Sequence, residues 1–402
     1  MTVYDDLGVR PIINAAGPMT RLSGMPLAPE VASAMAEAAQ YCVRIEDLQE
    51  AAGRYLAEVT GAEAGYVTTG AAAGLALSAA ACIARHDVAA MDRLPDVAGL
   101  RHEIIIQRPH LTAYTHALRL SGARLVEVGY LGFPGQGTTW PWQIEAAITP
   151  QTAAIAFSYG SAGGVVPLED VVALAHHHDL PVIVDAAGAL PPAENLRKLI
   201  AAGADLVAFS GGKAIGGPQA SGILAGRADL IESVALQHQD MDVYPATWTW
   251  RERYLATGRL PGPPHHGLGR PMKVGKEEIV GLVVALRRFL ARDDQAEWQA
   301  QAALLTGILT DIAGIPGVSG QLLEGQRAYP TAVITLDEQA LGRTATDIVN
   351  ELLAADPPLA VSQNFLGQHA IGLVAAAFRP GDDERAAAVL CQVLTQRANQ
   401  RG

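Results

Sequence analysis

The turn at residues 68–74, Thr-Thr-Gly-Ala-Ala-Ala-Gly, is the first segment whose residue types suit a chemical role. It leads from a short β-rich run into an alanine-rich stretch with a helical pattern. Small residues let the backbone close on an anion, and a helix N-terminus offers free N–H groups and the positive end of its dipole. The turn is therefore a candidate phosphate site, although an ordinary tight connection between a strand and a helix has the same composition.

Asp185 ends the apolar run VIVD (182–185), directly before Ala186-Ala187-Gly188. A carboxylate at the end of a buried strand needs a partner that offsets its desolvation. The cationic ring nitrogen of a bound cofactor is one such partner. The alternative role is an N-cap for the following helix.

Lys213 follows the apolar run LVAFS (206–210) in the segment Ser210-Gly211-Gly212-Lys213. A lysine flanked by glycines at a strand end points into the crevice where α/β proteins bind ligands, and its amine suits Schiff-base chemistry. The hydroxyl of Ser210 can donate to the same phosphate as the turn at 70–72. Taken alone, such a lysine is most often a surface residue.

The order of these motifs along the chain favours one cofactor, pyridoxal 5′-phosphate (PLP). A PLP site needs a phosphate turn, then an acidic strand end, then Ser-x-x-Lys one βα unit later, and the chain has them in that order. The aspartate keeps the pyridine nitrogen protonated, so that the ring remains an electron sink. His110 follows the run EIIIQ between the first two motifs, and its imidazole can stack on the ring or cap a helix.

The segments around these motifs alternate between strand and helix patterns from about residue 60 to 226. Short β-rich runs lie at 65–68, 103–107, 124–129, 153–159, 182–185, 206–210 and 222–225, with helical patterns such as 168–178 and 194–202 between them. This alternation predicts βαβ units and a mostly parallel sheet. Such sheets bind ligands outside the carboxyl ends of their strands, where the three motifs stand.

The alternation stops in a stretch at 240–270 that is rich in Pro, Gly and Trp and predicts a long loop. A long amphipathic helix follows around 279–290, and then helices and strands that form a small α+β domain. We expect an N-terminal segment (1–60) that packs with the small domain or with a partner subunit, a large cofactor-binding domain (61–270) and a small C-terminal domain (271–402).

Composition and charge restrict the class of protein. The net charge of −12 argues against a nucleic-acid or membrane surface as the main partner. No apolar run is long enough to span a bilayer, and the first residues lack the pattern of a signal peptide. The three scattered cysteines suit a reducing cytoplasm. We expect no metal site, because the histidine runs at 176–178 and 265–266 lack further ligands in a chelating pattern.

Five separated segments resemble one family of PLP enzymes. FSGGKAIGGPQASGIL (209–224) is similar to the PLP-lysine segment of selenocysteine synthase. Four others are closer still to the D-glucosaminate-6-phosphate ammonia-lyase branch: PIINAAGPMTRLSG (11–24), LQEAAGRYLAEVTGAEAGYVTTGAAAG (48–74), PVIVDAAGALPPAENL (181–196) and GRPMKVGKEEIVGL (269–282). The resemblance covers most of the chain and implies the aspartate-aminotransferase-like fold, fold type I, an α/β class with a large mostly parallel-sheet domain.

The resemblance also implies roles for individual residues. Lys213 is expected to hold PLP as a Schiff base and to act as the catalytic residue, with Asp185 against the pyridinium and His110 stacked on the ring. The expected phosphate contacts are Gly70, Ala71 and Ser210.

Three arginines are candidates for binding the carboxylate of a substrate. Arg379 follows the last strand pattern of the small domain, where fold type I carries its carboxylate-binding arginine. The guanidinium fork matches a carboxylate in two hydrogen bonds. Arg270 and Arg21 stand at a loop edge and in a resemblance-bearing segment. Each of the three is equally consistent with an ordinary surface residue.

The expected activity is elimination of the β-hydroxyl from a 2-amino-3-hydroxy acid, which gives a 2-keto acid and ammonia. Racemisation or epimerisation and transamination are alternatives that start from the same carbanion. Selenium transfer on an aminoacyl-tRNA is not expected, because the INAAG motif begins near residue 12 without a tRNA-binding segment before it. A non-catalytic scaffold disagrees with the intact Lys213 and Asp185. The uncharged residues 111–113 do not favour a phosphorylated substrate, and we expect a homodimer.

Overall fold

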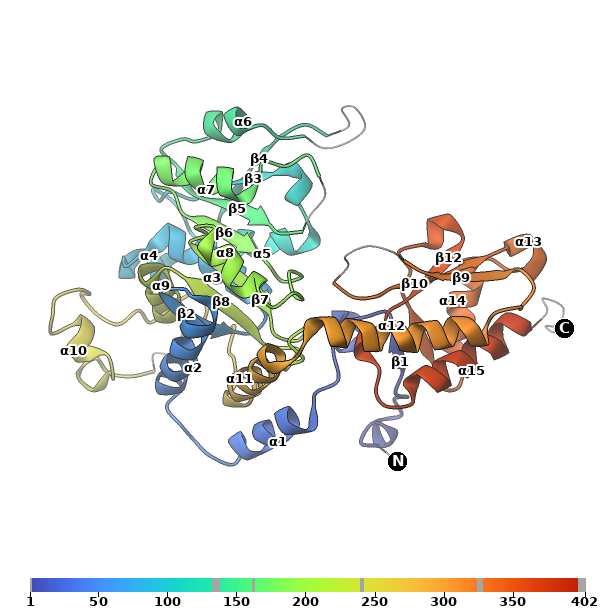
Figure 1. Ribbon diagram of the computed structural model, residues 1–402. Coiled ribbons are helices and arrows are strands. Elements are labelled where there is room, and N and C mark those ends of the chain that lie inside the picture. The colour runs from blue at the N-terminus through green and yellow to red at the C-terminus, as the bar shows by residue number, and fades with distance from the viewer. Residues whose placement is uncertain (1, 132–137, 161–162, 239–241, 324–327, 397–402) are drawn as a thin grey trace. The chain divides into compact units, whose positions relative to one another are not determined.

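The computed structural model describes residues 2–131, 138–160, 163–238, 242–323 and 328–396. The chain forms two compact units (Figure 1). The smaller unit combines Met1–Leu27 with Phe289–Gly402, and the larger unit contains Ala28–Arg288. These boundaries differ from the expected ones at residues 60 and 270, since residues 28–60 and 271–288 belong to the larger unit.

A seven-stranded sheet forms the centre of the larger unit, in the order β2-β8-β7-β6-β5-β3-β4. Its strands are β2 (Ala64–Thr68), β3 (Glu103–Gln107), β4 (Arg124–Val128), β5 (Thr152–Ser158), β6 (Val182–Asp185), β7 (Leu206–Ser210) and β8 (Gly222–Gly226). Only β8 runs antiparallel to its neighbours, and the other pairs are parallel. The inner strands are buried along nearly their whole length, as strands covered on both faces are.

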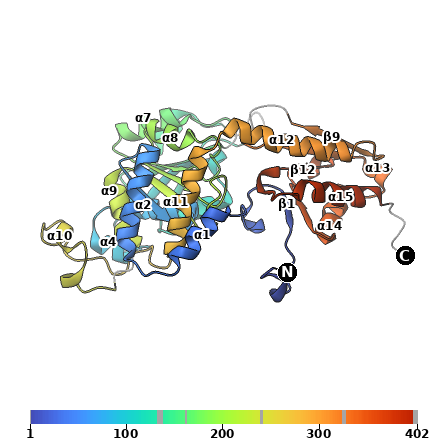
Figure 2. The same cartoon turned by 60° about the horizontal axis from the view of Figure 1, so that its bottom comes forward.

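Helices of the larger unit cover this sheet, whereas the short helix at 251–254 lies apart from it (Figure 2). The helices of this unit are α1 (Pro29–Ala38), α2 (Ile45–Thr60), α3 (Ala71–Ala84), α4 (Val88–Arg93), α5 (His116–Arg119), α6 (Pro141–Ala146), α7 (Leu168–His177), α8 (Asn195–Ala201), α9 (Ala228–His238) and α10 (Arg251–Tyr254). α3 is buried on nearly every side and packs against β5, β6, β7 and β8. α11 (Lys276–Ala291) leads into the smaller unit.

α2 belongs to the larger unit because it seals the edge of the sheet. The Gln49 side chain donates to the carbonyl of Val67 at 2.9 Å and accepts from its N–H at 3.1 Å, so its amide pairs with the edge strand β2 as a neighbouring strand would. Gly53 and Gly65 face each other without side chains, and a Cβ on either would meet the backbone of the other. Because of this close approach, α2 packs as part of the larger unit and not as part of a separate N-terminal segment.

The smaller unit has its own core and two small sheets. β9 (Val318–Leu322), β10 (Ala332–Leu336) and β12 (Ala370–Leu373) form an antiparallel sheet, and β1 (Ile13–Ala15) pairs in parallel with β11 (Leu359–Val361). The helices are α12 (Asp294–Asp311), α13 (Glu338–Leu341), α14 (Ala345–Ala354) and α15 (Asp382–Thr395). A capping box between Thr344 and Asp347 fixes the start of α14. In the described part of the chain, no helix is long and apolar enough to cross a membrane.

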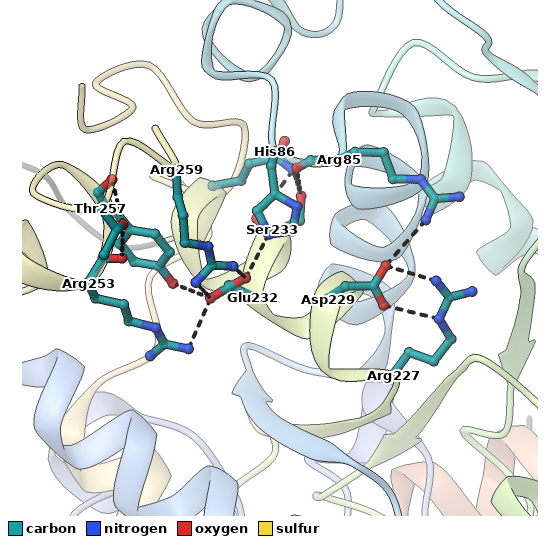
Figure 3. A network of polar contacts seen from close by, with 11 residues as sticks. Arg85, His86, Arg227, Asp229, Glu232, Ser233, Arg253, Thr257 and Arg259 are labelled. Atoms are coloured by element: carbon teal, nitrogen blue, oxygen red, sulfur yellow. Dashed lines mark hydrogen bonds and ion pairs between the residues drawn. The ribbon is translucent and has the colours of Figure 1, made fainter. Parts of the chain in front are cut away.

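A polar network fastens the segment after Trp250 to α9 (Figure 3). Glu232 on α9 accepts hydrogen bonds at Oε1 from the Tyr254 hydroxyl (2.8 Å) and Arg253 (3.0 Å). Its Oε2 accepts from Arg259 (2.6 Å) and lies 2.8 Å from His86. Burial alone would raise the pKa of Glu232. The hydrogen bonds of His86, Arg259 and Tyr254 outweigh it and lower that pKa to about 2. Glu232 is therefore ionised and is the anionic centre of this network.

Candidate active site

The candidate site lies at the carboxyl ends of β6 and β7. The two strands are parallel neighbours with Asp185 opposite Ala208, so the polypeptide leaves both strands at the same edge of the sheet. Asp185 is the last residue of β6 and Ser210 is the last residue of β7. The turn that carries Lys213 begins directly after Ser210. The fold thus brings the acidic strand end and the lysine segment together.

The carboxyl group of Asp185 has fewer hydrogen-bond donors around it, among the described residues, than it has oxygen lone pairs to accept them. The N–H of Ala187 donates to its Oδ1 at 3.0 Å. Burial raises the pKa of Asp185, and this effect exceeds the opposing effects of the Ala187 N–H and of the nearby Lys213 ammonium. A cation placed against this carboxylate is therefore stabilised, and the carboxylate in turn gains the charge partner that burial demands.

Lys213 is positioned by two glycines that pack where no side chain fits. A Cβ on Gly211 would meet the side chains of Ser221 and Leu282, and a Cβ on Gly212 would lie 2.5 Å from the Cα of Gln219. The Lys213 side chain is half-buried, and its Nζ lies 6.0 Å from the centroid of the Tyr114 ring. The amine is thus directed between the lysine turn and the segment that follows His110.

His110 is buried, with 1% of its surface exposed, and stands edge-on to Phe157 with ring centroids 4.3 Å apart. Neither ring nitrogen has a hydrogen-bond partner among the described residues. Burial lowers the pKa of His110 to about 4, so the imidazole is neutral near pH 7. A small cavity of about 10 Å³, the size of one water molecule, lies between His110, Phe157, Ser158 and Asp185. Buried polar groups normally have hydrogen-bond partners, so the ring nitrogens of His110 mark a position at which a ligand can supply them.

The candidate phosphate turn and Ser210 lie on either side of Gly222. Gly222 on β8 pairs with Thr68 on β2 and with Ser210 on β7, so the three residues form one row across the sheet. Gly70 begins α3 with a φ of +84° and has open space where a Cβ would stand. A Cβ on Gly222 would lie 2.8 Å from the N of Ala71. The absence of a side chain at Gly222 thus lets β8 approach the backbone of the turn, where the N–H of Gly70 donates to the carbonyl of Thr68 at 2.9 Å.

The three candidate arginines differ in their surroundings. Arg270 lies in the larger unit, donates to Asp242 at 2.8 Å and borders a shallow depression with His265, His266 and Lys273. Arg379 and Arg21 lie in the smaller unit. The backbone N–H of Arg379 donates to the buried Asp382 at 2.8 Å, and its Nε lies 3.5 Å from the same oxygen. Arg21 is exposed, and its guanidinium has no hydrogen bond or ion pair with a described residue.

The histidine runs have local partners of their own. His176 lies 2.8 Å from Asp205, and His178 lies 3.7 Å from Glu145. The backbone N–H groups of His265 and His266 both donate to Asp92. Within the described ranges, no three His, Cys, Asp or Glu side chains gather in a way that could hold a metal ion.

Three residues of the site were missed in the sequence. Phe157 lies near the end of β5, and the direction of its side chain could have been counted from the alternation along that strand. Tyr114 follows His110 by four residues and lies on the short 3-10 turn Ala113–Thr115, which is too short for a period to show the direction of its side chain. Gly222 is one glycine among many, and only the pairing of β8 between β2 and β7 reveals its importance.

Comparisons with known proteins agree with this arrangement. A family model described as SelA: L-seryl-tRNA selenium transferase matches residues 12–241. The chain is 34% identical over 367 residues to the 5'-C-glycyluridine monooxygenase-decarboxylase of a Streptomyces species, covering 89% of this chain and 83% of the relative. It is 34% identical over 359 residues to the D-glucosaminate-6-phosphate ammonia lyase of Salmonella typhimurium, covering 87% and 86%.

A solved structure of D-glucosaminate-6-phosphate ammonia-lyase superposes on the chain with a TM-score of 0.83 and 31% sequence identity, covering 99% of this chain and 100% of that one. The expectation of fold type I from the sequence is thereby confirmed, as is the resemblance to the ammonia-lyase branch. Since the family model matches more than half of the chain and relatives align over most of their own length, the chain belongs to the L-seryl-tRNA selenium transferase family.

Proposed function

We propose that the chain is a PLP-dependent ammonia-lyase that converts a 2-amino-3-hydroxy acid into a 2-keto acid and ammonia. The observation that carries this proposal is that Asp185 and the turn with Lys213 follow neighbouring strands at one sheet edge. Near them lies the buried imidazole of His110, whose ring nitrogens have no hydrogen-bond partner among the described residues. The similarity to D-glucosaminate-6-phosphate ammonia lyase supports the same class of reaction.

The residues of the site match the chemical groups of PLP one by one. The raised pKa of Asp185 and its buried position suit a pyridinium nitrogen, which supplies the missing positive partner. The neutral face of His110 suits an aromatic ring. Gly70, Ala71 and Ser210 flank Gly222 with small side chains, as a phosphate requires. Lys213 supplies the amine for the aldehyde.

The reaction needs a group that moves a proton at the α-carbon. PLP, when bound, supplies the electron sink that stabilises negative charge at this carbon. The amine of Lys213 removes the α-proton, and the β-hydroxyl leaves as water with a proton returned to it. The unsaturated amino acid then takes up one water and releases ammonia. One water leaves and one is consumed, so the 2-keto acid and ammonia account for all atoms of the substrate.

The proposal extends to how the substrate is bound and to the oligomeric state. The substrate carboxylate is bound by an arginine, for which Arg379, Arg270 and Arg21 are the candidates. The enzyme acts on a small molecule, and it works as a homodimer, which the mass of the native protein in light scattering tests. The uncharged residues 111–113 favour a substrate without a phosphate.

The proposal is tested by product analysis on a panel of D- and L-2-amino-3-hydroxy acids, with and without a terminal phosphate. We expect equal amounts of ammonia and 2-keto acid, under argon and without an acceptor keto acid. Formation of keto acid only with an acceptor would identify a transaminase, and recovery of the inverted amino acid would identify a racemase. A requirement for oxygen with release of carbon dioxide would identify the chemistry in the name of the Streptomyces relative. Any of these three results contradicts the lyase.

A further inference from the structure

The smaller unit contains a pocket at the carboxyl ends of two parallel strands. β1 and β11 pair in parallel, with Ala15 opposite Val361, so the chain leaves both strands at the same edge. The segments that follow, within 16–22 and 362–364, line a pocket of about 280 Å³. Ligands bind at this edge in open α/β sheets. The volume is close to the lower end of the range of about 300–1,000 Å³ for small-molecule pockets.

The turn after β1 is fixed before any ligand binds. Asn14 is buried, accepts a hydrogen bond from the N–H of Ala16 at 2.9 Å and donates its amide to the carbonyl of Gly17 at 3.0 Å. Gly17 has a φ of +86°, and a Cβ there would lie 3.3 Å from Cγ1 of Val374. The backbone of the turn at 14–17, from which the pocket-lining segment continues, is therefore fixed.

Arg21 is the charged group of this pocket. It lies on the short helical turn Thr20–Leu22, and it is the one charged side chain among the described residues that line the pocket. Its guanidinium has no acidic or carbonyl partner in the described part of the chain, whereas Arg379 lies against Asp382 and Arg270 against Asp242. Of the three candidate arginines, Arg21 is the one without an acidic partner among the described residues.

The opposite wall supplies neutral polar groups. Ser362 is buried, and its backbone N–H and carbonyl are both paired with Gly372, which fixes the segment. Gln363 and Asn364 follow and border the same pocket with their side-chain amides. Hydroxyl and amide groups opposite an arginine suit a ligand that carries hydroxyls next to one anionic group.

We propose that this pocket binds the carboxylate of an open-chain hydroxy acid through Arg21. A planar guanidinium matches a carboxylate in two parallel hydrogen bonds. A single cation suits a monoanion, whereas a phosphate dianion would remain half uncompensated. Met19, Leu22 and Leu353 add apolar surface to the lining of the pocket. The proposal deepens the proposed function, on which it rests only for the kind of acid.

The test is calorimetric titration of the full-length, PLP-loaded protein with gluconate, which has the carboxylate and hydroxyls but no amine and cannot react. We expect one binding site per chain. Arg21→Gln weakens the affinity at least tenfold, because a charged hydrogen-bond pair is lost. Arg21→Lys retains part of the affinity, since it keeps the charge without the fork. Arg10→Gln is the matched control in the same unit, because Arg10 is exposed and has only a long contact with the carbonyl of Ala355. It leaves the affinity unchanged.

The outcomes separate this proposal from the lyase proposal, because gluconate binding does not depend on turnover and PLP loading is read independently by visible absorption. Gluconate binding that Arg21→Gln does not change overturns the carboxylate site, whatever the activity. So does stronger, Arg21-dependent binding of inorganic phosphate than of gluconate, which would assign a phosphate site instead. Absence of gluconate binding to the wild type overturns it as well. Arg21-dependent binding in a protein without lyase activity supports the pocket and overturns the lyase alone.

Discussion

Burial determines how the site residues behave before a ligand is present. His110 is almost fully enclosed, and neither of its ring nitrogens has a partner among the residues that the structure describes. Asp185 is partly buried, with the N–H of Ala187 as a donor and the ammonium of Lys213 nearby. Desolvation therefore favours the neutral form of both groups. The sequence could predict Asp185, because a carboxylate at the end of an apolar run is conspicuous. The isolation of His110 could not be predicted, since it depends on Phe157 from another strand.

The lowered pKa of His110 makes stability depend on pH. In the unfolded chain a histidine titrates near about 6.5, and in the folded chain His110 titrates near about 4. Between these values the unfolded state binds more protons, so the stabilising effect is complete above pH 6.5 and is lost as the pH falls towards 4. The free energy of unfolding of the PLP-free protein falls by up to about 1.4 kcal/mol per pH unit from this group.

Urea unfolding at pH 7.5 and at pH 5 measures this effect. His110→Phe should lose less stability on acidification than the wild type, whereas the exposed His116→Gln should behave as the wild type does. If the wild type and His110→Phe lose stability equally between these two pH values, the buried neutral imidazole is not a feature of the folded protein.

At the scale of elements, patterns in the sequence predicted the large sheet well and the small one less well. The apolar runs at 103–107, 182–185 and 206–210 coincide with β3, β6 and β7, because strands buried on both faces leave an unmistakable apolar pattern. β1 and β11 have three residues each, too few for a period to be seen. The pocket of Arg21 lies beyond the carboxyl ends of these two strands, so its existence could not be predicted from the chain.

The network around Glu232 fixes an element that is too irregular to hold itself in place. The segment 251–259 has one short helix, and its side chains bond to Glu232 on α9 (Figure 3). Because Glu232 has a folded pKa of about 2, its stabilising effect is complete above the unfolded pKa of about 4.3 and is lost as the pH falls to 2.

Glu232→Gln should reduce the free energy of unfolding at pH 7 by about 1–3 kcal/mol, because charge-assisted hydrogen bonds are lost in a partly buried network. The difference from the wild type should shrink as the pH falls below 4.3. Glu50→Gln is the control, since Glu50 contacts Arg253 at 3.5 Å on the surface and should contribute less than about 1 kcal/mol. Denaturation curves of the wild type and the two variants measure these differences. Equal losses of stability in the two variants would contradict the stabilising role of Glu232.

At the scale of the whole molecule, the family and fold could be recognised from five segments, but the division into units could not. The boundary was expected near residue 60 because the βαβ rhythm begins there. Gln49 and Gly53 instead join α2 to the sheet through contacts with Val67 and Gly65. Such contacts depend on two elements that meet in space, so the hydrophobic periodicity of either element alone cannot predict them.

The account of the whole molecule depends on Lys213 as the residue that binds PLP, and one measurement tests this directly. The PLP-loaded protein is reduced with borohydride, digested and analysed by mass spectrometry. We predict that the peptide containing Lys213 carries the mass of reduced PLP, and that Lys213→Ala carries none and lacks the visible absorption of the wild type. PLP on a different lysine, or a wild type that stays colourless and unmodified with PLP added, would contradict the assignment.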